Sequence, residues 1–304
     1  MQETEKKKVK LVDVGPRDGF QNVKEFIPTE FKLEIIDGLV KAGYKKIQCT
    51  SFVSPKAIAQ MQDAAEIGAA VLGKYPGVDF FALVPNYFGA QAAVKAGFRE
   101  ITPVMSLSVS HNQSNVRRTH AESIEELARI RQDFPDLKIT QDIATVFGCP
   151  FEGKMEIPPL IELLGKLNRL GITAFTLCDT IGVAYPDQVK AVLTACRAAF
   201  PDCEFNLHIH DTRNMGILNS YTGVLCGADS IQTAVGGLGG CPFAPGATGN
   251  TSSEDFVYML QQQGYETGID FDLLLAVAKK LHSKVEGNYS GHHINITINQ
   301  CGYQ

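Results

Sequence analysis

The sequence predicts an α/β fold, a (β/α)8 TIM barrel with a helical C-terminal extension. Short apolar segments typical of strands recur eight times along the 304 residues, at spacings of roughly 30 residues. Helical patterns lie between them, and four of these helices run into a glycine just before the next strand, at Gly43, Gly97, Gly171 and Gly227. A chain of this length also suits one α/β barrel.

The strand segments are short and rich in β-branched and aromatic residues. We expect strands at residues 9–15, 46–52, 79–85, 100–106, 138–147, 174–179, 204–210 and 230–236. Their even distribution along the chain is what a closed ring of parallel strands requires.

The helical segments carry apolar residues on one stripe. We expect helices at residues 30–42, 55–72, 88–95, 123–133, 157–170, 186–199, 213–226 and 253–262, with the helical extension from about Phe271. Ser123 and Glu126 have the spacing of a capping box, which predicts that one helix starts at Ser123. Residues 106–120 are expected to form a long loop after the fourth strand.

A doubly wound open sheet is the alternative architecture. That fold needs a glycine fingerprint of the GxGxxG type after its first strand, whereas the residues found there are GPRDG at 15–19. A Pro-, Gly- or Ser-rich linker is also missing from the sequence, so we expect residues 1–304 to form one domain.

Composition narrows the class of protein. The formal net charge is −5, with 44% hydrophobic and 20% charged residues, which gives no reason to expect nucleic acid or a membrane as a partner. The N-terminal residues mix acidic and basic side chains and lack an apolar signal segment. We therefore expect a cytoplasmic protein whose eight cysteines are reduced. The oligomeric state stays open at this stage, and a homodimer is one state the sequence allows.

Unusual polar residues cluster where the predicted strands end. The ends of strands 1, 2, 6 and 7 and the segment after strand 8 carry the following set: Arg17, Asp18, Gln48, Ser51, Asp179, His208, His210 and Asn250. Barrel active sites lie at this end of the strands. His208 and His210 are two residues apart on a strand and so share one face. Two imidazoles, a carboxylate and an amide oxygen suit Mg²⁺ or Mn²⁺, and Zn²⁺ is also compatible. The alternative is a pair of histidines that serves only to hydrogen-bond the barrel rim.

A glycine-rich segment follows the eighth strand, with six glycines between positions 236 and 249. Cys241 lies inside it, and a protonated thiol there is suited to act as an acid above a bound substrate. A phosphate cradle and a plain turn are the competing interpretations. Arg17 is suited to bind a carboxylate, a phosphate or an enolate oxygen, and a structural ion pair with Asp18 or Asp179 is its alternative.

Several motifs resemble the 3-hydroxy-3-methylglutaryl-CoA lyase family. They are VGPRDGFQN at 14–22, TSFVSPK at 50–56, VFGCPFEGK at 146–154, DTIGV at 179–183, HIHDT at 208–212, GLGGCPFA at 237–244 and Gly249-Asn250. The family has a TIM-barrel fold. The resemblance implies metal-assisted cleavage of 3-hydroxy-3-methylglutaryl-CoA, or of a close 3-hydroxyacyl-CoA variant, to acetyl-CoA and a ketone, which is acetoacetate for the parent substrate.

The resemblance also implies roles for individual residues. The implied metal ligands are Asp18, His208, His210 and Asn250. Arg17 would stabilise the enolate oxygen, and Cys241 would deliver the proton that completes acetyl-CoA. His208 and Asp179 match positions implicated in proton transfer.

Positions that would contact the acyl-CoA substrate follow from the same match. Ser51 and Thr176 correspond to positions near the substrate, and Lys24 corresponds to a basic position near CoA. Lys284 aligns with a lysine that contacts CoA.

Two residues depart from the family pattern. Gln48 stands where the family has a glutamate, so the shape is kept while the charge and the acid–base capacity are lost. Cys178 stands where the family usually has a glycine. Gln48 lies at a position beside the substrate, which leaves open a different 3-hydroxyacyl-CoA or a CoA-binding protein that has lost turnover. A condensing synthase that uses acetyl-CoA and a 2-oxo acid is a further alternative, because wider relatives that run this direction share the arginine–aspartate turn and the HxH pair.

Overall fold

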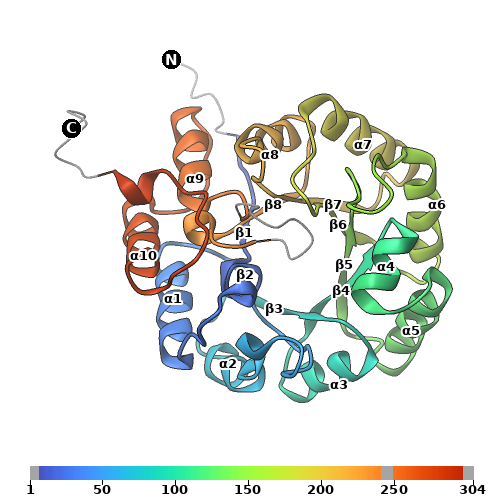
Figure 1. Ribbon diagram of the computed structural model, residues 1–304, viewed down its shortest axis with the longest axis horizontal. Coiled ribbons are helices and arrows are strands. Elements are labelled where there is room, and N and C mark those ends of the chain that lie inside the picture. Colours follow the sequence, from blue (N-terminus) through green and yellow to red (C-terminus); the bar gives the residue numbers. More distant parts are fainter. Residues whose placement is uncertain (1–6, 241–248, 297–304) are drawn as a thin grey trace.

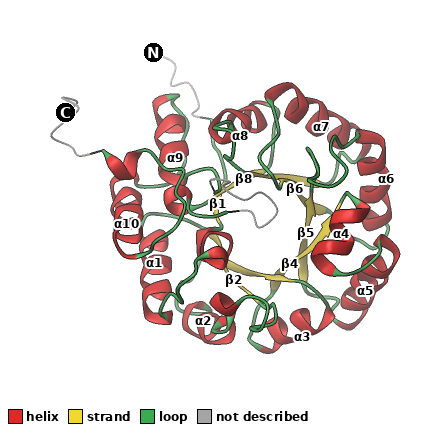
Figure 2. Ribbon diagram, viewed as in Figure 1, coloured by secondary structure: helices red, strands yellow, loops and turns green. Residues whose placement is uncertain are grey.

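The computed structural model describes residues 7–240 and 249–296, and within them eight parallel strands close into a barrel (Figures 1 and 2). The strands are β1 (Leu11–Asp13), β2 (Lys46–Ser51), β3 (Asp79–Val84), β4 (Glu100–Ser106), β5 (Lys138–Ala144), β6 (Ala174–Asp179), β7 (Glu204–Ile209) and β8 (Ser230–Thr233). Each pairs with its neighbour in the sequence, and β1 pairs with β8. The barrel prediction is confirmed, and the open-sheet alternative is wrong.

Side chains along each strand point alternately toward the helices and into the barrel. One row of residues paired across neighbouring strands is apolar and buried against the helices: Met105, Ile143, Leu177, Leu207 and Ile231. The row beside it faces the barrel interior and is largely polar: Val104, Asp142, Thr176, Asn206 and Ser230. The main core therefore lies between strands and helices, while Val12, Val14 and Phe81 form a small separate apolar cluster.

The helices surround this ring (Figure 2). They are α1 (Thr29–Lys41), α2 (Ala64–Val71), α3 (Tyr87–Lys95), α4 (Val109–Val116), α5 (His120–Asp133), α6 (Ile157–Asn168), α7 (Pro186–Ala199), α8 (Gly216–Leu225), α9 (Ser253–Gln262) and α10 (Phe271–Lys284). In the part of the chain that is described, no helix is long and apolar enough to cross a membrane.

Two sequence predictions about helices are wrong. The capping box belongs to Thr119 and Glu122, and α5 begins at His120, before the predicted start at Ser123. Residues 106–120 contain α4 and are not a long loop; Ser108 caps this helix by accepting a hydrogen bond from the backbone N–H of His111. Few apolar residues lie along α4, so hydrophobic periodicity carries no signal for it.

A third prediction, one continuous helix over residues 55–72, is only half right. A 3-10 turn occupies Ala59–Met61, and α2 begins at Ala64. The Gln60 side chain donates to the backbone carbonyl of Val23 at 2.9 Å and accepts from the backbone N–H of Ile27 at 3.1 Å. These bonds to a distant segment replace the local pattern of a helix.

The C-terminal helix α10 begins at Phe271, as predicted, and lies beside α1 (Figure 1). The contact is close because Gly38 of α1 has no side chain. A Cβ atom at this position would lie 2.5 Å from Cγ2 of Val277 on α10. The glycine thus sets the distance between the barrel and its extension.

Replacing Gly38 with alanine should therefore destabilise the protein. We expect Gly38→Ala to lower the free energy of unfolding by about 1–2 kcal/mol through overpacking against α10. Gly165→Ala in α6 is the matched control, because the new Cβ would lie 3.6 Å from the nearest atom of Phe200, an ordinary contact distance. There we expect a gain of about 0.5–1 kcal/mol from helix propensity. The midpoints of urea unfolding measure both, and equal shifts would contradict the α1–α10 packing.

Candidate metal centre at the barrel mouth

A five-residue π-helical turn after β1, Gly15–Gly19, presents Arg17 and Asp18 to the barrel mouth. The Asp13 carboxylate fixes this turn, because it accepts from the Gly15 N–H at 2.8 Å and from the Ser253 hydroxyl at 2.7 Å. A Cβ on Gly15 would lie 2.9 Å from the Asp13 carboxylate. The turn thus requires a glycine at its first position.

Four side chains from three segments of the chain meet here: Asp18 from the turn, His208 and His210 from the end of β7, and Asn250 from the segment after β8. Nε2 of His208 lies 3.8 Å and Nε2 of His210 lies 3.7 Å from Oδ2 of Asp18. The two Nε2 atoms are 3.0 Å apart. Asn250 donates from Nδ2 to the same Asp18 oxygen at 2.9 Å. The metal-ligand set predicted from the sequence is therefore brought together, and all four side chains are buried.

The electrostatics suit a cation. Burial alone would raise the pKa of Asp18, but the charge of Arg17 and the nearby imidazoles of His210 and His208 hold it well below its usual range. Burial lowers the pKa of His208 to about 3, so its ring is neutral near pH 7. An ionised carboxylate and a neutral imidazole are the forms that bind metals.

The donor set fits a divalent ion. Among the described residues, one group of His, Cys, Asp and Glu side chains has ligand atoms within 4.8 Å of one another, and it consists of Asp18, His208 and His210. Oδ1 of Asn250 is buried without a hydrogen-bond partner among the same residues, which leaves its lone pairs available as a fourth ligand. Nitrogen and oxygen donors without a thiolate favour Mg²⁺, Mn²⁺ or Zn²⁺ over softer ions.

Gln232 orients His208. Nε2 of Gln232 donates to Oγ1 of Thr176 at 3.3 Å, so its Oε1 faces Nδ1 of His208 at 3.1 Å. An amide oxygen only accepts, so Nδ1 of His208 carries the proton. The lone pair of this ring is then on Nε2, which faces Asp18 and His210.

Arg17 is held from two sides. Its Nε donates to Oε1 of Gln48, and its Nη1 pairs with Asp18. The ion pair with Asp18 that the sequence offered as an alternative is therefore present. Gln48 Nε2 and Ser51 Oγ lack hydrogen-bond partners among the described residues although both are buried, so both are free to meet a ligand.

Asp179 does not join the metal centre. Its carboxylate accepts from the backbone N–H groups of Val183 at 2.9 Å and Ala184 at 3.0 Å, which shapes the segment between β6 and α7. Burial raises the pKa of Asp179. Thr176, by contrast, faces the barrel interior in register with Asp142 and Asn206.

Lys24 lies at a second feature, a cavity of about 870 Å³ beside the barrel mouth. Lys284 of α10 lines the same cavity, as do the aromatic residues Phe26 and Phe31. Gly19, which directly follows the Asp18 ligand position, also lines it. The cavity thus extends from the end of the turn that carries Asp18 to two exposed lysines.

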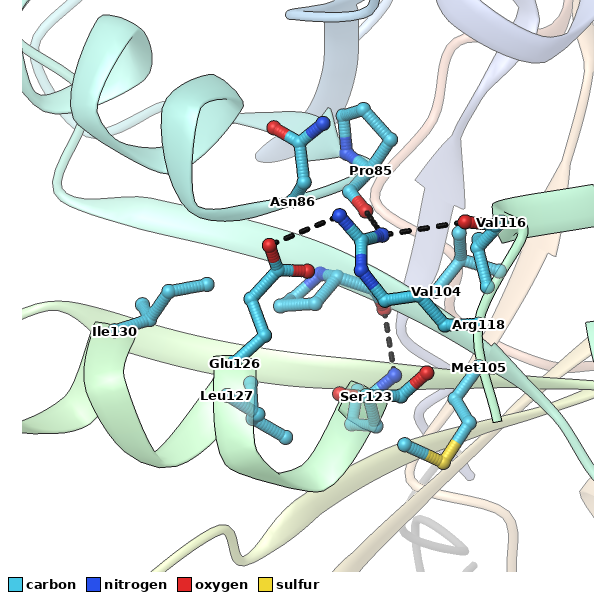
Figure 3. A pocket seen from close by; sticks show the side chains of 12 residues that line it. Pro85, Asn86, Val104, Met105, Val116, Arg118, Ser123, Glu126, Leu127 and Ile130 are labelled. Carbon is cyan, nitrogen blue, oxygen red and sulfur yellow. Dashed lines mark hydrogen bonds and ion pairs between the residues drawn. The ribbon is translucent and has the colours of Figure 1, made fainter. Parts of the chain in front are cut away.

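Arg118 has a structural role (Figure 3). It donates to the carbonyls of Pro85 and Val116 and pairs with Glu126 at 3.0 Å, which ties α4 to α5. Figure 3 shows these partners converging on its guanidinium. Cys241, the predicted proton donor, lies outside the described residues.

Sequence reasoning missed two residues of the interior, Gln232 and Asp142. Each occupies an inward-facing position on a strand, in register with a residue that was singled out: Gln232 with His208, and Asp142 with Thr176. A polar residue at such a position was the available signal. It becomes readable only once the register between strands is known.

Comparison with known proteins gives consistent relatives. The HMGL-like family model matches residues 8–281. A hydroxymethylglutaryl-CoA lyase of Bacillus subtilis (strain 168) is 40% identical over 281 residues, covering 92% of this chain and 94% of that protein. The mitochondrial hydroxymethylglutaryl-CoA lyase of Bos taurus is 38% identical over 289 residues, covering 92% and 89%.

A solved structure shares the whole fold. It is an HMG-CoA lyase from Acenitobacter baumannii in complex with coenzyme A and 3-methylmalate, and it superposes with a TM-score of 0.92 at 35% identity. The match covers 98% of this chain and 97% of that one.

The orientation of His208 yields a prediction about metal affinity. We expect Gln232→Leu to weaken Mn²⁺ binding by about 10- to 100-fold, because the Nδ1 proton loses its acceptor and the ring its fixed tautomer. Gln232→Glu retains an acceptor and should bind at least as tightly as the original protein. Isothermal titration with Mn²⁺ measures both. Equal weakening in the two variants would contradict this role of Gln232.

Proposed function

The chain belongs to the HMGL-like family, and we propose that it is a metal-dependent carbon–carbon lyase that cleaves 3-hydroxy-3-methylglutaryl-CoA to acetyl-CoA and acetoacetate. The observation that carries the proposal is the buried cluster of Asp18, His208 and His210 beside Arg17 at the barrel mouth. A divalent cation and an acyl-CoA are the partners that this family membership implies.

The reaction is a retro-Claisen cleavage. The 3-hydroxyl loses its proton, the C2–C3 bond breaks, and the electron pair of that bond moves into the enolate of the thioester. A proton returned to C2 completes acetyl-CoA, and the ketone fragment leaves. A bound divalent cation supplies Lewis acidity at the 3-hydroxyl.

We assign the ligand positions to Asp18, His208, His210 and Asn250, with Mg²⁺ or Mn²⁺ as the preferred ion and Zn²⁺ as an alternative. In this assignment both nitrogens of His208 are committed, one to Gln232 and one to the ligand position. The proton-transfer role that the resemblance implied therefore suits Asp179 better than His208. Burial raises the pKa of Asp179, which is the direction expected for a carboxyl group that exchanges a proton.

Arg17 stabilises the enolate oxygen in this scheme. Gln48 and Asp18 hold its guanidinium at the mouth, so no reorganisation is needed as negative charge develops. Gln48, Ser51 and Thr176 surround the acyl part of the substrate. Cys241 remains the proposed donor of the proton to C2.

The cavity lined by Lys24 and Lys284 is the proposed CoA site. Its volume of about 870 Å³ suits a large cofactor, and its aromatic residues suit an adenine or pantetheine contact. The two lysines supply positive charge for phosphates.

We also propose that barrel and α10 act as one domain, since α10 lines this cavity through Lys284. The cytoplasmic location predicted from the sequence stays a proposal, as does a homodimer.

A related acyl-CoA lyase with a different 3-hydroxyacyl-CoA is the second candidate. Gln48 favours it, because an amide at this position binds Arg17 without adding the negative charge that the family glutamate carries. The structural relative from Acenitobacter baumannii was solved with 3-methylmalate beside coenzyme A. A panel of 3-hydroxyacyl-CoAs, scored by acetyl-CoA release, separates the two candidates.

Acetyl-CoA release with Mg²⁺ or Mn²⁺ tests the function, and two variants test the site. His210→Ala should abolish both metal binding and turnover, because a ligand is lost. Cys241→Ala should leave Mn²⁺ binding intact and lower kcat by about 10²- to 10⁴-fold, the usual contribution of an acid–base group. No acetyl-CoA from any 3-hydroxyacyl-CoA would refute the lyase. Stoichiometric Mn²⁺ binding by His210→Ala would refute the metal assignment.

The lysines should affect substrate binding and leave the chemistry unchanged. We expect Lys24→Ala and Lys284→Ala each to raise KM for the acyl-CoA by about fivefold at unchanged kcat, which corresponds to about 1 kcal/mol for an exposed ion pair. The effect should shrink at high salt. Lys190→Ala on α7 is the control for loss of one surface charge. An unchanged KM in both cavity variants would place CoA elsewhere.

A further inference from the structure

Asp142 is a buried carboxyl group in the barrel interior to which no role has been given so far. It lies on β5 and is 4% exposed. Its register partners are Val104 on β4 and Thr176 on β6, and all three belong to the row that faces inward. Ile143, the next residue, belongs to the outward row that packs against the helices. Asp142 therefore points into the barrel.

One oxygen of this carboxyl group has no partner. Oδ1 of Asp142 is fully buried and accepts no hydrogen bond from any residue the structure describes. An orphaned buried polar atom is costly to the fold, so such atoms are rare unless a ligand completes them. Gln48 Nε2, Ser51 Oγ and Asn250 Oδ1, all of them site residues, are orphaned in the same way.

Asp142 lies among the charged groups of the mouth. Burial raises its pKa to about 7, against the charge of Arg17 and the nearby hydroxyl of Thr176, which lower it. Asp18 adds a smaller upward effect. The neighbouring strand β6 carries two ionisable groups, Cys178 and Asp179. The pKa of Cys178 is raised by burial and then by Asp142. The register partner on β4, Val104, carries no charge.

We infer that Asp142 is a further substrate-contacting residue, whose free carboxyl oxygen meets an oxygen of the acyl group in the bound thioester. This inference rests on the proposed lyase function. It adds a contact that decides which acyl groups the site accepts. No metal-ligand role is assigned to Asp142, which lies outside the group of ligand atoms formed by Asp18, His208 and His210.

The chemistry of the acyl group sets the form of the contact. The 3-hydroxy-3-methylglutaryl group is itself acidic and offers only acceptor atoms besides its hydroxyl. A protonated Asp142 donates to such an acceptor, whereas an ionised Asp142 repels it. Substrate binding should therefore favour the protonated carboxyl group. An acyl group that placed a methyl against Oδ1 would leave that oxygen without a partner, and the site would bind it less tightly.

The test is the pH dependence of KM for 3-hydroxy-3-methylglutaryl-CoA in the full-length protein with Mn²⁺. With a pKa of about 7, loss of the protonated form should raise KM by about tenfold between pH 6 and pH 8. Asp142→Asn donates at every pH, so its KM should change far less over this range. Asp142→Ala should show, at pH 6, a KM raised toward the pH 8 value of the original protein.

Two controls separate this inference from the proposed function. The dissociation constant for free CoA, which has no acyl group, should be the same in the original protein and in Asp142→Asn. The dissociation constant for Mn²⁺ should also be unchanged. If Asp142→Asn keeps the original KM–pH profile while the original protein releases acetyl-CoA, the inference fails and the lyase stands. If Mn²⁺ binding weakens in parallel with KM, Asp142 acts through Thr176, Gln232 and His208, and the inference fails as well.

Discussion

Closure of the barrel between β1 and β8 is the constraint on which the site depends. Asp18 follows β1 and His208 lies on β7, almost 200 positions later in the chain, so only a closed ring brings them within 4 Å. The segment after β8 then returns Asn250 to the Asp18 carboxylate. A carboxylate, two imidazoles and an amide converge because consecutive parallel strands end at one rim, and no local segment could assemble this set alone.

The charges at this rim are stabilised by one another. Burying a guanidinium or a carboxylate alone is costly, and Arg17 and Asp18 offset that cost by pairing side by side on a turn. The same burial keeps His208 neutral. The pKa values of Asp18 and His208 are thus both lowered but for different reasons, since the carboxylate has a cationic neighbour and the imidazole is desolvated without sufficient compensation. The result is a pair of groups ready to bind a cation near neutral pH.

The sequence was sufficient for the barrel and for the proximity of Asp18, His208, His210 and Asn250, because both depend on where strands end. A His-x-His pair and an Arg-Asp pair remain at strand ends even when each boundary moves by a residue or two. The helix at Val109–Val116 was missed because hydrogen-bonding side chains such as Ser108 and Asn112 hold it, and they leave no apolar periodicity. Gln232 was missed for another reason: its function is to orient His208 on the adjacent strand, and that relation exists only in the register of the sheet.

Gln48 is the residue whose interpretation changes most when the structure is considered. In the sequence it is a lost carboxylate. In the structure its amide oxygen accepts from Arg17, so the guanidinium has a neutral partner on β2 and an anionic one in Asp18. Asp142 points into the same barrel interior from β5, and its pKa is near neutrality. A site with a glutamate on β2 would be permanently more negative, whereas this site holds a carboxyl group that can be neutral when an acidic acyl chain arrives. Selectivity among acyl groups then depends on where the barrel interior places its negative charge.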